Sequence, residues 1–208
     1  MNKNFITAYC IAENNIVYKN GLELYATEGI LSENFFLSAY NHFNLNYPKF
    51  YKMDNLSKLG WLASEILLKD ENLHEHYASE DIGIVLSNAN ASLDTDLNYS
   101  ETIKDIPSPA VFVYTLPNIV IGEISIRNGF KGENAFFISE KFDAALLEQY
   151  VNILFSSNAC QSCICGWTET LEDNYKCVLF LVEKEKRNLN LEFIKDNLEA
   201  IFNANAEG

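Results

Sequence analysis

Apolar residues recur along the chain with two different periods, and their alternation predicts an α/β fold. The run Ile82–Leu86 is continuously apolar, which is typical of a strand covered on both faces of a sheet. From Asp54 to about Lys69 the apolar residues follow the helical period instead, and Asp54 is a suitable N-terminal cap. We expect further strands over 5–12, 16–18, 134–139, 160–168 and 175–182, and further helices over 32–43, near 99, over 117–128 and 143–154, and from 190.

The segment from Gly132 to Glu169 predicts a strand, a tight turn, a helix and a second strand. Asn134–Ser139 is the first strand, Asp143 caps the helix, and Lys141 stands at the turn. Such a turn places a side chain at the positive end of a helix, where the pKa of a thiol is lowered and the thiolate favoured. A lysine is opposed by the same dipole and is protonated at neutral pH, so it is a poor nucleophile there.

Length and composition predict one compact domain over residues 1–208. Hydrophobic residues make up 48% of the chain, and only nine glycines and four prolines leave little room for long linkers. The net charge of −14 repels phosphate backbones and anionic membrane surfaces, so nucleic acid and membranes are not expected as partners. No signal-peptide core and no run long enough to span a bilayer is visible, which predicts a cytoplasmic protein.

Three of the five cysteines lie close together, as Cys160, Cys163 and Cys165. Thiolates at short spacing can hold zinc or an iron–sulfur cluster, but such a site needs a fourth ligand in a matching pattern. None of the three histidines offers that pattern (His42, His74 and His76). We therefore expect these thiols to be buried as small apolar groups, with Cys163 and Cys165 on one face of a strand, and we expect no metal or cofactor. A metal or redox role for the three thiols is the alternative.

Two other polar pairs are weak candidates for chemistry. Asp94 and Asp96 could form a carboxylate pair for acid–base catalysis or cation binding, but alone they are expected to be capping and solvated loop residues. His74 and His76 are two positions apart, so they do not share a helical face, and their acidic surroundings predict a solvated segment.

Four segments, occurring in the expected order, resemble the N-terminal half of the β-ketoacyl-acyl-carrier-protein synthases, which have the thiolase fold. They are Tyr51–Leu59, Ile82–Ser92, Pro109–Gly132 and Gly132–Glu169, and the last matches without a gap through the family's Gly-Gly-Ala-Glu ending. The resemblance implies a single thiolase-like half, with a five-stranded mixed sheet and helices on both faces. It also implies that the C-terminal half of the family is absent from residues 1–208.

Counting along the gapless segment places the family's active-site cysteine on Lys141, and no cysteine lies within ten residues on either side. In the family that thiolate accepts the acyl chain, and two histidines of the C-terminal half stabilise the enolate and the oxyanion. The resemblance therefore implies that no catalytic residue is present and that acyl transfer by this chain alone has no mechanism.

The same family contains non-catalytic partner subunits, the chain-length factors, in which the cysteine is replaced. The resemblance implies this role beside an active ketosynthase, in fatty-acid or polyketide biosynthesis of the aryl-polyene type. Two alternatives stay open. One is a structural module of the same half-fold that associates only with itself, and the other is an active acyltransferase completed by a partner chain that buries Lys141.

In thiolase-type folds the strand before the nucleophile pairs with its counterpart across a twofold axis. The resemblance therefore implies a dimer interface along 134–139, with a ketosynthase or with a second copy, through Asn134, Phe136, Phe137 and Ser139. An uncharged Ala-Phe-Phe-Ile edge would also promote aggregation if it were left uncovered. The alternative is that both phenylalanines face the core. Because acyl-carrier proteins are acidic, we expect this acidic chain to contact them only indirectly, through a basic partner.

Overall fold

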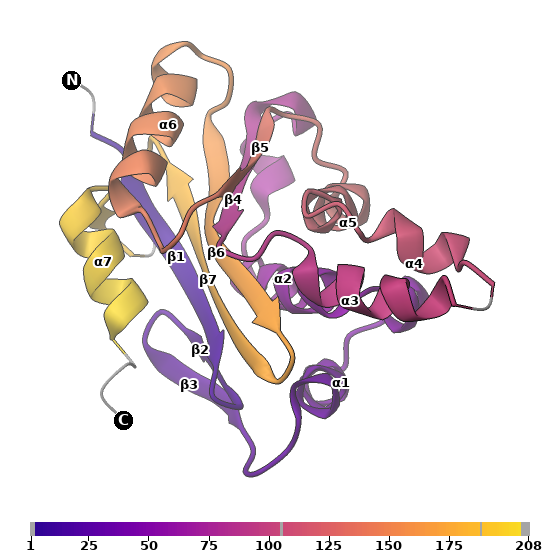
Figure 1. Cartoon of the computed structure of the whole chain (residues 1–208). Coiled ribbons are helices and arrows are strands. Elements are labelled where there is room, and N and C mark those ends of the chain that lie inside the picture. Colours follow the sequence, from indigo (N-terminus) through magenta and orange to yellow (C-terminus); the bar gives the residue numbers. More distant parts are fainter. Residues whose placement is uncertain (1–2, 105, 188, 205–208) are drawn as a thin grey trace.

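A computed structural model describes residues 3–104, 106–187 and 189–204 of the chain. In these residues one mixed sheet has the strand order β3-β2-β1-β7-β6-β4-β5 (Figure 1). Strand β8 is outside this order and pairs with the first two residues of β1. The strands β4, β5 and β6 are parallel to one another, whereas the other neighbours are antiparallel. The strands are β1 (Phe5–Glu13), β2 (Ile16–Lys19), β3 (Leu22–Ala26), β4 (Ile82–Asn88), β5 (Asn134–Ile138), β6 (Ser162–Leu171), β7 (Asn174–Glu183) and β8 (Leu191–Glu192).

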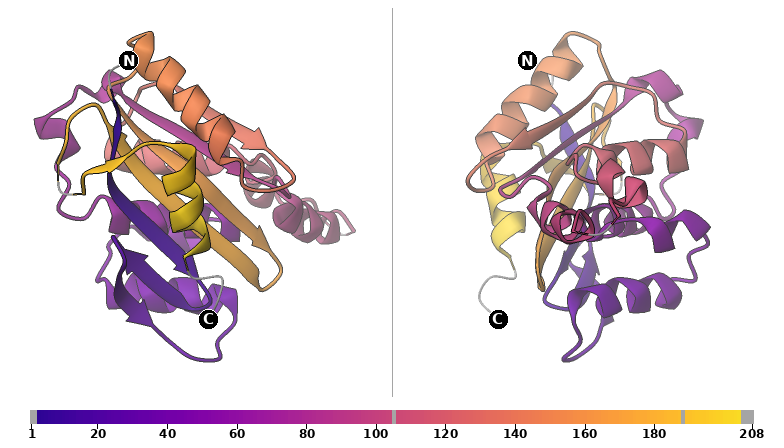
Figure 2. Two further views of the ribbon diagram at one scale, coloured as in Figure 1. Left: turned by 90° about the vertical axis from the view of Figure 1, so that its left-hand side faces the viewer. Right: turned by 45° about the vertical axis from the view of Figure 1, so that its right-hand side comes forward.

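Helices cover both faces of the sheet, as predicted. Figure 1 shows α6 and α7 on one face and α1, α2 and α5 on the other, and the two views in Figure 2 agree. The helices are α1 (Ser32–His42), α2 (Asn55–Leu67), α3 (Leu93–Thr102), α4 (Pro109–Val113), α5 (Ile119–Asn128), α6 (Ala144–Ser156) and α7 (Lys195–Asn203), with short 3-10 turns η1 (Pro48–Lys52), η2 (Leu73–Glu75) and η3 (Ser79–Asp81).

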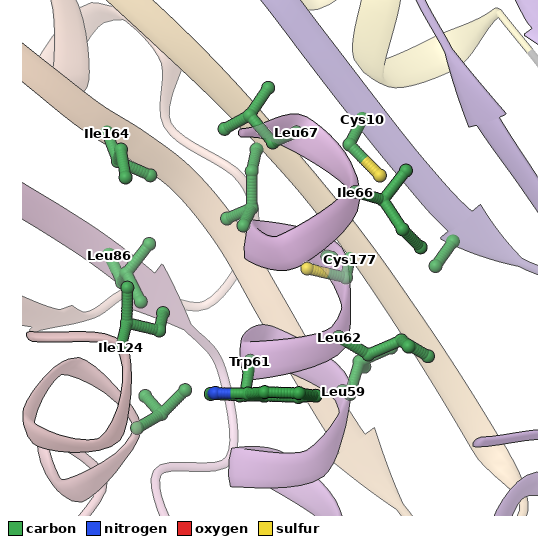
Figure 3. Close-up of a cluster of buried hydrophobic side chains, with 14 of the residues drawn as sticks. Cys10, Leu59, Trp61, Leu62, Ile66, Leu67, Leu86, Ile124, Ile164 and Cys177 are labelled. Carbon is green, nitrogen blue, oxygen red and sulfur yellow. The ribbon is translucent and has the colours of Figure 1, made fainter. Parts of the chain in front are cut away.

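The larger of two apolar clusters is organised by α2. Asp54 caps this helix by accepting a hydrogen bond from the Ser57 amide at 3.0 Å, as its sequence predicted. Figure 3 shows the apolar residues of α2 packed over the sheet, with Ile124 of α5 beside Leu86 of β4. Gly60 permits this close packing, since a β-carbon there would lie 2.4 Å from a methyl group of Val120. The second cluster lies under α6 and α7.

The expected five-stranded sheet is wrong in strand number, because the sheet has eight strands. The five consecutive strands β1, β7, β6, β4 and β5 are extended on the β1 side by β2 and β3, and β8 adds to the start of β1. Two tight turns create this extension: Asn14 and Asn15 form the first, Asn20 and Gly21 the second, and all four have positive φ. Such turns match the twist of antiparallel strands and fold the chain back on itself.

Two expected elements have different bounds in the structure, and one further strand was not expected. The last helix does not begin near Asn190, because Leu191 pairs with Ile6 in β8 and α7 begins only at Lys195. The strand expected over 160–168 is β6, which begins at Ser162 and continues to Leu171 through its long pairing with β7. Strand β3 was not expected, since it lies at the edge of the sheet and is mostly exposed.

Candidate functional site

The turn between β5 and α6 has the predicted strand-turn-helix geometry. Ile138 is in register with Asn88 of the parallel neighbour β4, and the Ser139 amide donates a hydrogen bond to the Asn88 carbonyl at 2.9 Å. On the other side Asp143 caps α6, accepting a hydrogen bond from the Leu146 amide at 2.9 Å. The turn over 139–143 is therefore held at both ends.

Lys141 lies in this turn with its side chain exposed. Within the part of the chain that the structure describes, its ammonium group makes no ion pair. The imidazoles His42 and His74 pack on elements of the opposite sheet face, His42 on Tyr25 at 4.5 Å and His74 on Phe130 at 5.5 Å. Neither of these two imidazoles is therefore brought to the turn.

The residue after Lys141 is covered by the C-terminal helix. The Phe142 ring stacks on Phe202 of α7, with centroids 4.1 Å apart and planes 4° from parallel. The Lys176 ammonium lies 4.4 Å from the Phe202 centroid, and Trp167 packs edge-on against both phenylalanines. The sequence does not indicate this pairing, since 60 residues separate the two stacked rings.

A second loop, after β4, is held by the carboxylate of Glu169, the last residue of the segment that runs from Gly132 to Glu169. Glu169 on β6 accepts hydrogen bonds from the amides of Ala89 at 2.6 Å and Asn90 at 3.1 Å. The Asn88 side chain closes the same loop through the amide and carbonyl of Ala91. Glu169 therefore orders the path from β4 into α3.

The two acidic candidates have structural partners. Asp94 accepts hydrogen bonds from the Glu172 amide at 3.0 Å and from the Asn55 side chain at 3.4 Å. Asp96 lies 3.3 Å from the Ser92 hydroxyl, which donates its hydrogen to the nearer Thr115 carbonyl at 2.7 Å. Asp94 therefore ties the β6–β7 hairpin to α2 rather than forming a carboxylate pair with Asp96.

All five cysteines are free and buried, as the sequence predicted for the clustered three. Cys163 and Cys165 lie in the cluster beneath α6 and α7, on one face of β6. Burial raises the pKa of both thiols, whereas a hydrogen bond from Cys163 lowers the pKa of Cys160. No three metal-binding side chains gather with suitable geometry within 3–104, 106–187 and 189–204.

Strand β5 is the edge of the sheet opposite β3, and its two phenylalanines lie on opposite faces. Phe136 is half-buried against the larger cluster, and Phe137 packs on Tyr150 of α6 with ring centroids 5.0 Å apart. Asn134 and Ile138 are exposed at the ends of the strand, and Ser139 is half-buried just beyond it.

Comparison with known proteins gives matches among solved structures only; no family model and no curated protein sequence matches the chain. The ishigamide ketosynthase/chain length factor matches 87% of this chain at 18% identity, with a TM-score of 0.63. A structure of the ketosynthase ApeO in complex with its chain length factor ApeC from Xenorhabdus doucetiae matches 88% at 14% identity, with a TM-score of 0.54. The chain has the ketosynthase and chain-length-factor fold.

Further matches agree with this fold assignment. A type II polyketide ketosynthase complex with its acyl-carrier protein matches 88% of the chain, with 14% identity and a TM-score of 0.61. The chain spans 62% of the matched chain both there and in the ishigamide protein, and 80% in the ApeO–ApeC structure. Among the described residues, no helix is both long and apolar enough to cross a bilayer.

Proposed function

We propose that this chain is a non-catalytic, chain-length-factor-type partner subunit of an active ketosynthase, in fatty-acid or polyketide biosynthesis of the aryl-polyene type. The observation that carries the proposal is the combination of the ketosynthase fold with an exposed Lys141 at the turn where the resemblance places a nucleophilic cysteine. The nearest thiol, Cys160, is buried before β6, so it cannot take the place of that nucleophile.

The partner would pair with the β5 edge. Among the described residues this strand pairs with β4 alone, so the backbone groups of its other side are available to a strand of another chain. The expected interface residues are Asn134, Phe136, Phe137 and Ser139. Since Phe137 also packs on Tyr150, the better probe of the edge is Ile138, which is 53% exposed at the end of the strand.

Co-purification of the tagged chain from its native host, followed by mass spectrometry, tests the proposal. We expect a full-length ketosynthase in equal amount, and we expect Ile138→Asp to reduce its recovery. Recovery of the chain alone, as a homodimer, would contradict the proposal and favour the self-associating module. Transfer of a labelled acyl group onto this subunit in the complex would instead favour the acyltransferase alternative.

A further inference from the structure

Cys160 and Cys163 form a Cys-x-x-Cys motif where the loop after α6 enters β6. Two cysteines at this spacing are typical of redox-active pairs, which cycle between a dithiol and a disulfide. In such a pair one thiol has a lowered pKa and attacks, while the other closes the disulfide. The two sulfurs must therefore lie close together, and one of them must be the more acidic.

The two thiols lie beside each other in the apolar cluster beneath α6 and α7. Cys163 on β6 is in register with Gly83 on the parallel strand β4, and neighbouring strands lie about 4.8 Å apart. Gly83 leaves the space that Cys160 fills, since a β-carbon at Gly83 would lie 3.4 Å from the Cys160 sulfur. A hydrogen bond joins the two thiols, with Cys163 as the donor. The two sulfurs are therefore neighbours, as a disulfide between them requires.

The same hydrogen bond and the surrounding charges make the two thiols unequal. The hydrogen bond from Cys163 is the largest influence on the Cys160 thiol and lowers its pKa, and the Lys184 ammonium lowers that pKa further. Burial and the Asp81 and Glu133 carboxylates oppose this change, with a smaller combined effect. The pKa of Cys163 is instead raised well above its usual value, chiefly by burial. Cys160 is thus suited to attack and Cys163 to complete the disulfide.

The pair is buried, but it lies close to the surface of the protein. Asn158 and Gln161 are exposed on either side of Cys160 in the loop. The Gln161 amide donates a hydrogen bond to the Asp81 carbonyl at 2.8 Å, which holds one end of this loop. The Lys184 ammonium donates one to the Asn158 side chain at 3.3 Å, and both residues line a groove of about 940 Å³ beside α6. A local opening of the loop would therefore bring Cys160 into contact with a small molecule in the groove, without global unfolding.

We propose that Cys160 and Cys163 are a redox-active pair, converted to an intramolecular disulfide by exchange with a small disulfide such as oxidised glutathione. The Cys160 thiolate attacks one glutathione sulfur, and the glutathione disulfide bond breaks to release one reduced glutathione. The Cys163 thiol then loses its proton and attacks the Cys160 sulfur, which releases the second glutathione and leaves the protein disulfide. Two protein thiols are oxidised, one glutathione disulfide is reduced, and the two thiol protons pass to the released glutathiones. Exchange is slow because the loop must open first, and excess reduced glutathione reverses it.

Intact mass spectrometry of the native full chain tests the proposal. The protein is incubated for hours in glutathione buffers of increasing oxidised fraction, quenched with acid, and alkylated after unfolding, so that each free thiol gains a label. We expect two of the five thiols to be lost together, with no bound glutathione, and to return on reduction. Cys165→Ala, at a buried thiol on the same face of β6 as Cys163, is the matched control and should lose the same two thiols.

Two further variants separate the roles of the thiols. Cys163→Ala keeps the attacking thiol without its partner, so it should accumulate one bound glutathione per chain in place of the disulfide. Cys160→Ala should form neither product, and its number of free thiols should stay constant across the buffers. Circular dichroism before and after oxidation checks that every protein remains folded.

Three outcomes would overturn the proposal. Five free thiols in the most oxidising buffer would show that the pair is inert in the native protein. Loss of two thiols from Cys160→Ala as well would identify a different pair of cysteines. Loss of thiols only together with the circular dichroism signal would show that oxidation takes place in the unfolded chain.

Discussion

Burial decides the chemistry of the cysteines at the residue scale. The ketosynthase resemblance directs attention to a reactive thiolate, yet every cysteine of this chain lies inside the protein. Burial, and to a lesser extent the nearby Cys160 thiol, raises the pKa of Cys165. Burial also raises the pKa of Cys177 to about 12, although a hydrogen bond with Thr168 acts in the opposite direction. A thiol with a pKa this high is protonated at neutral pH and inert.

This burial predicts how the thiols respond to a disulfide reagent. We expect no rapid reaction of the native protein with dithionitrobenzoate at neutral pH, and five reacting thiols in guanidinium chloride. Because the pKa of Cys160 is lowered by the hydrogen bond from Cys163, Cys160 is expected to be the first thiol modified when the structure opens. A rapid stoichiometric reaction of the native chain would contradict the buried arrangement.

A second prediction at the residue scale concerns Asp54, whose burial raises its pKa above the usual 3.8. A carboxyl with a raised folded pKa contributes its full stability below the unfolded pKa, and this contribution is lost as pH rises through the folded pKa. Asp54→Asn keeps a cap for the Ser57 amide without the buried charge, so its stability relative to the parent should increase between about pH 3 and pH 7. Urea unfolding at the two pH values measures the change.

The matched variant Asp54→Ala removes the cap and the acceptor of the Thr95 hydroxyl, so it should lose about 1–2 kcal/mol at neutral pH. Equal destabilisation of both variants at every pH would contradict the expected effect of the buried Asp54 charge on stability.

At the scale of elements, the sequence correctly predicted the helices and strands whose own residues supply a cap or a clear apolar pattern. The caps Asp54 and Asp143 and the helical spacing after each predicted α2 and α6, and the continuous run Ile82–Leu86 predicted the buried strand β4. The missed elements have weak local signals. Strand β8 has two residues and exists only because β1 is available to pair with it.

Helix α7 covers the turn after β5 through contacts between residues distant in sequence, and a substitution of Phe202 tests how much these contacts stabilise the fold. Phe202→Ala removes the stack on Phe142 and the cation–π contact with Lys176, so we expect a loss of about 2 kcal/mol in the free energy of unfolding. Leu22→Ala, at a residue 66% exposed on β3, is the control and should change stability by less than about 0.5 kcal/mol. Equal effects in urea unfolding would show that α7 does not hold the turn.

Charge acts at the scale of the whole molecule. With a net charge of −14, the isolated chain should repel an acidic acyl-carrier protein. We expect no binding tighter than about 1 mM in a calorimetric titration at moderate salt, and measurable binding once the ketosynthase is present. Tight binding by the isolated chain would show that this subunit itself offers the docking surface.

The sequence by itself determined the alternation of strands and helices, the strand-turn-helix around Lys141 and the burial of the clustered cysteines, because each depends on neighbouring residues and their periodicity. Only the tertiary structure decided the eight-stranded sheet, the stacking of Phe202 on Phe142, the hydrogen bonds from the β4 loop to Glu169 and the exposure of apolar residues on α3 and α4. These features join residues distant in sequence, and an apolar residue on a short helix has the same local pattern whether it faces the core or a partner.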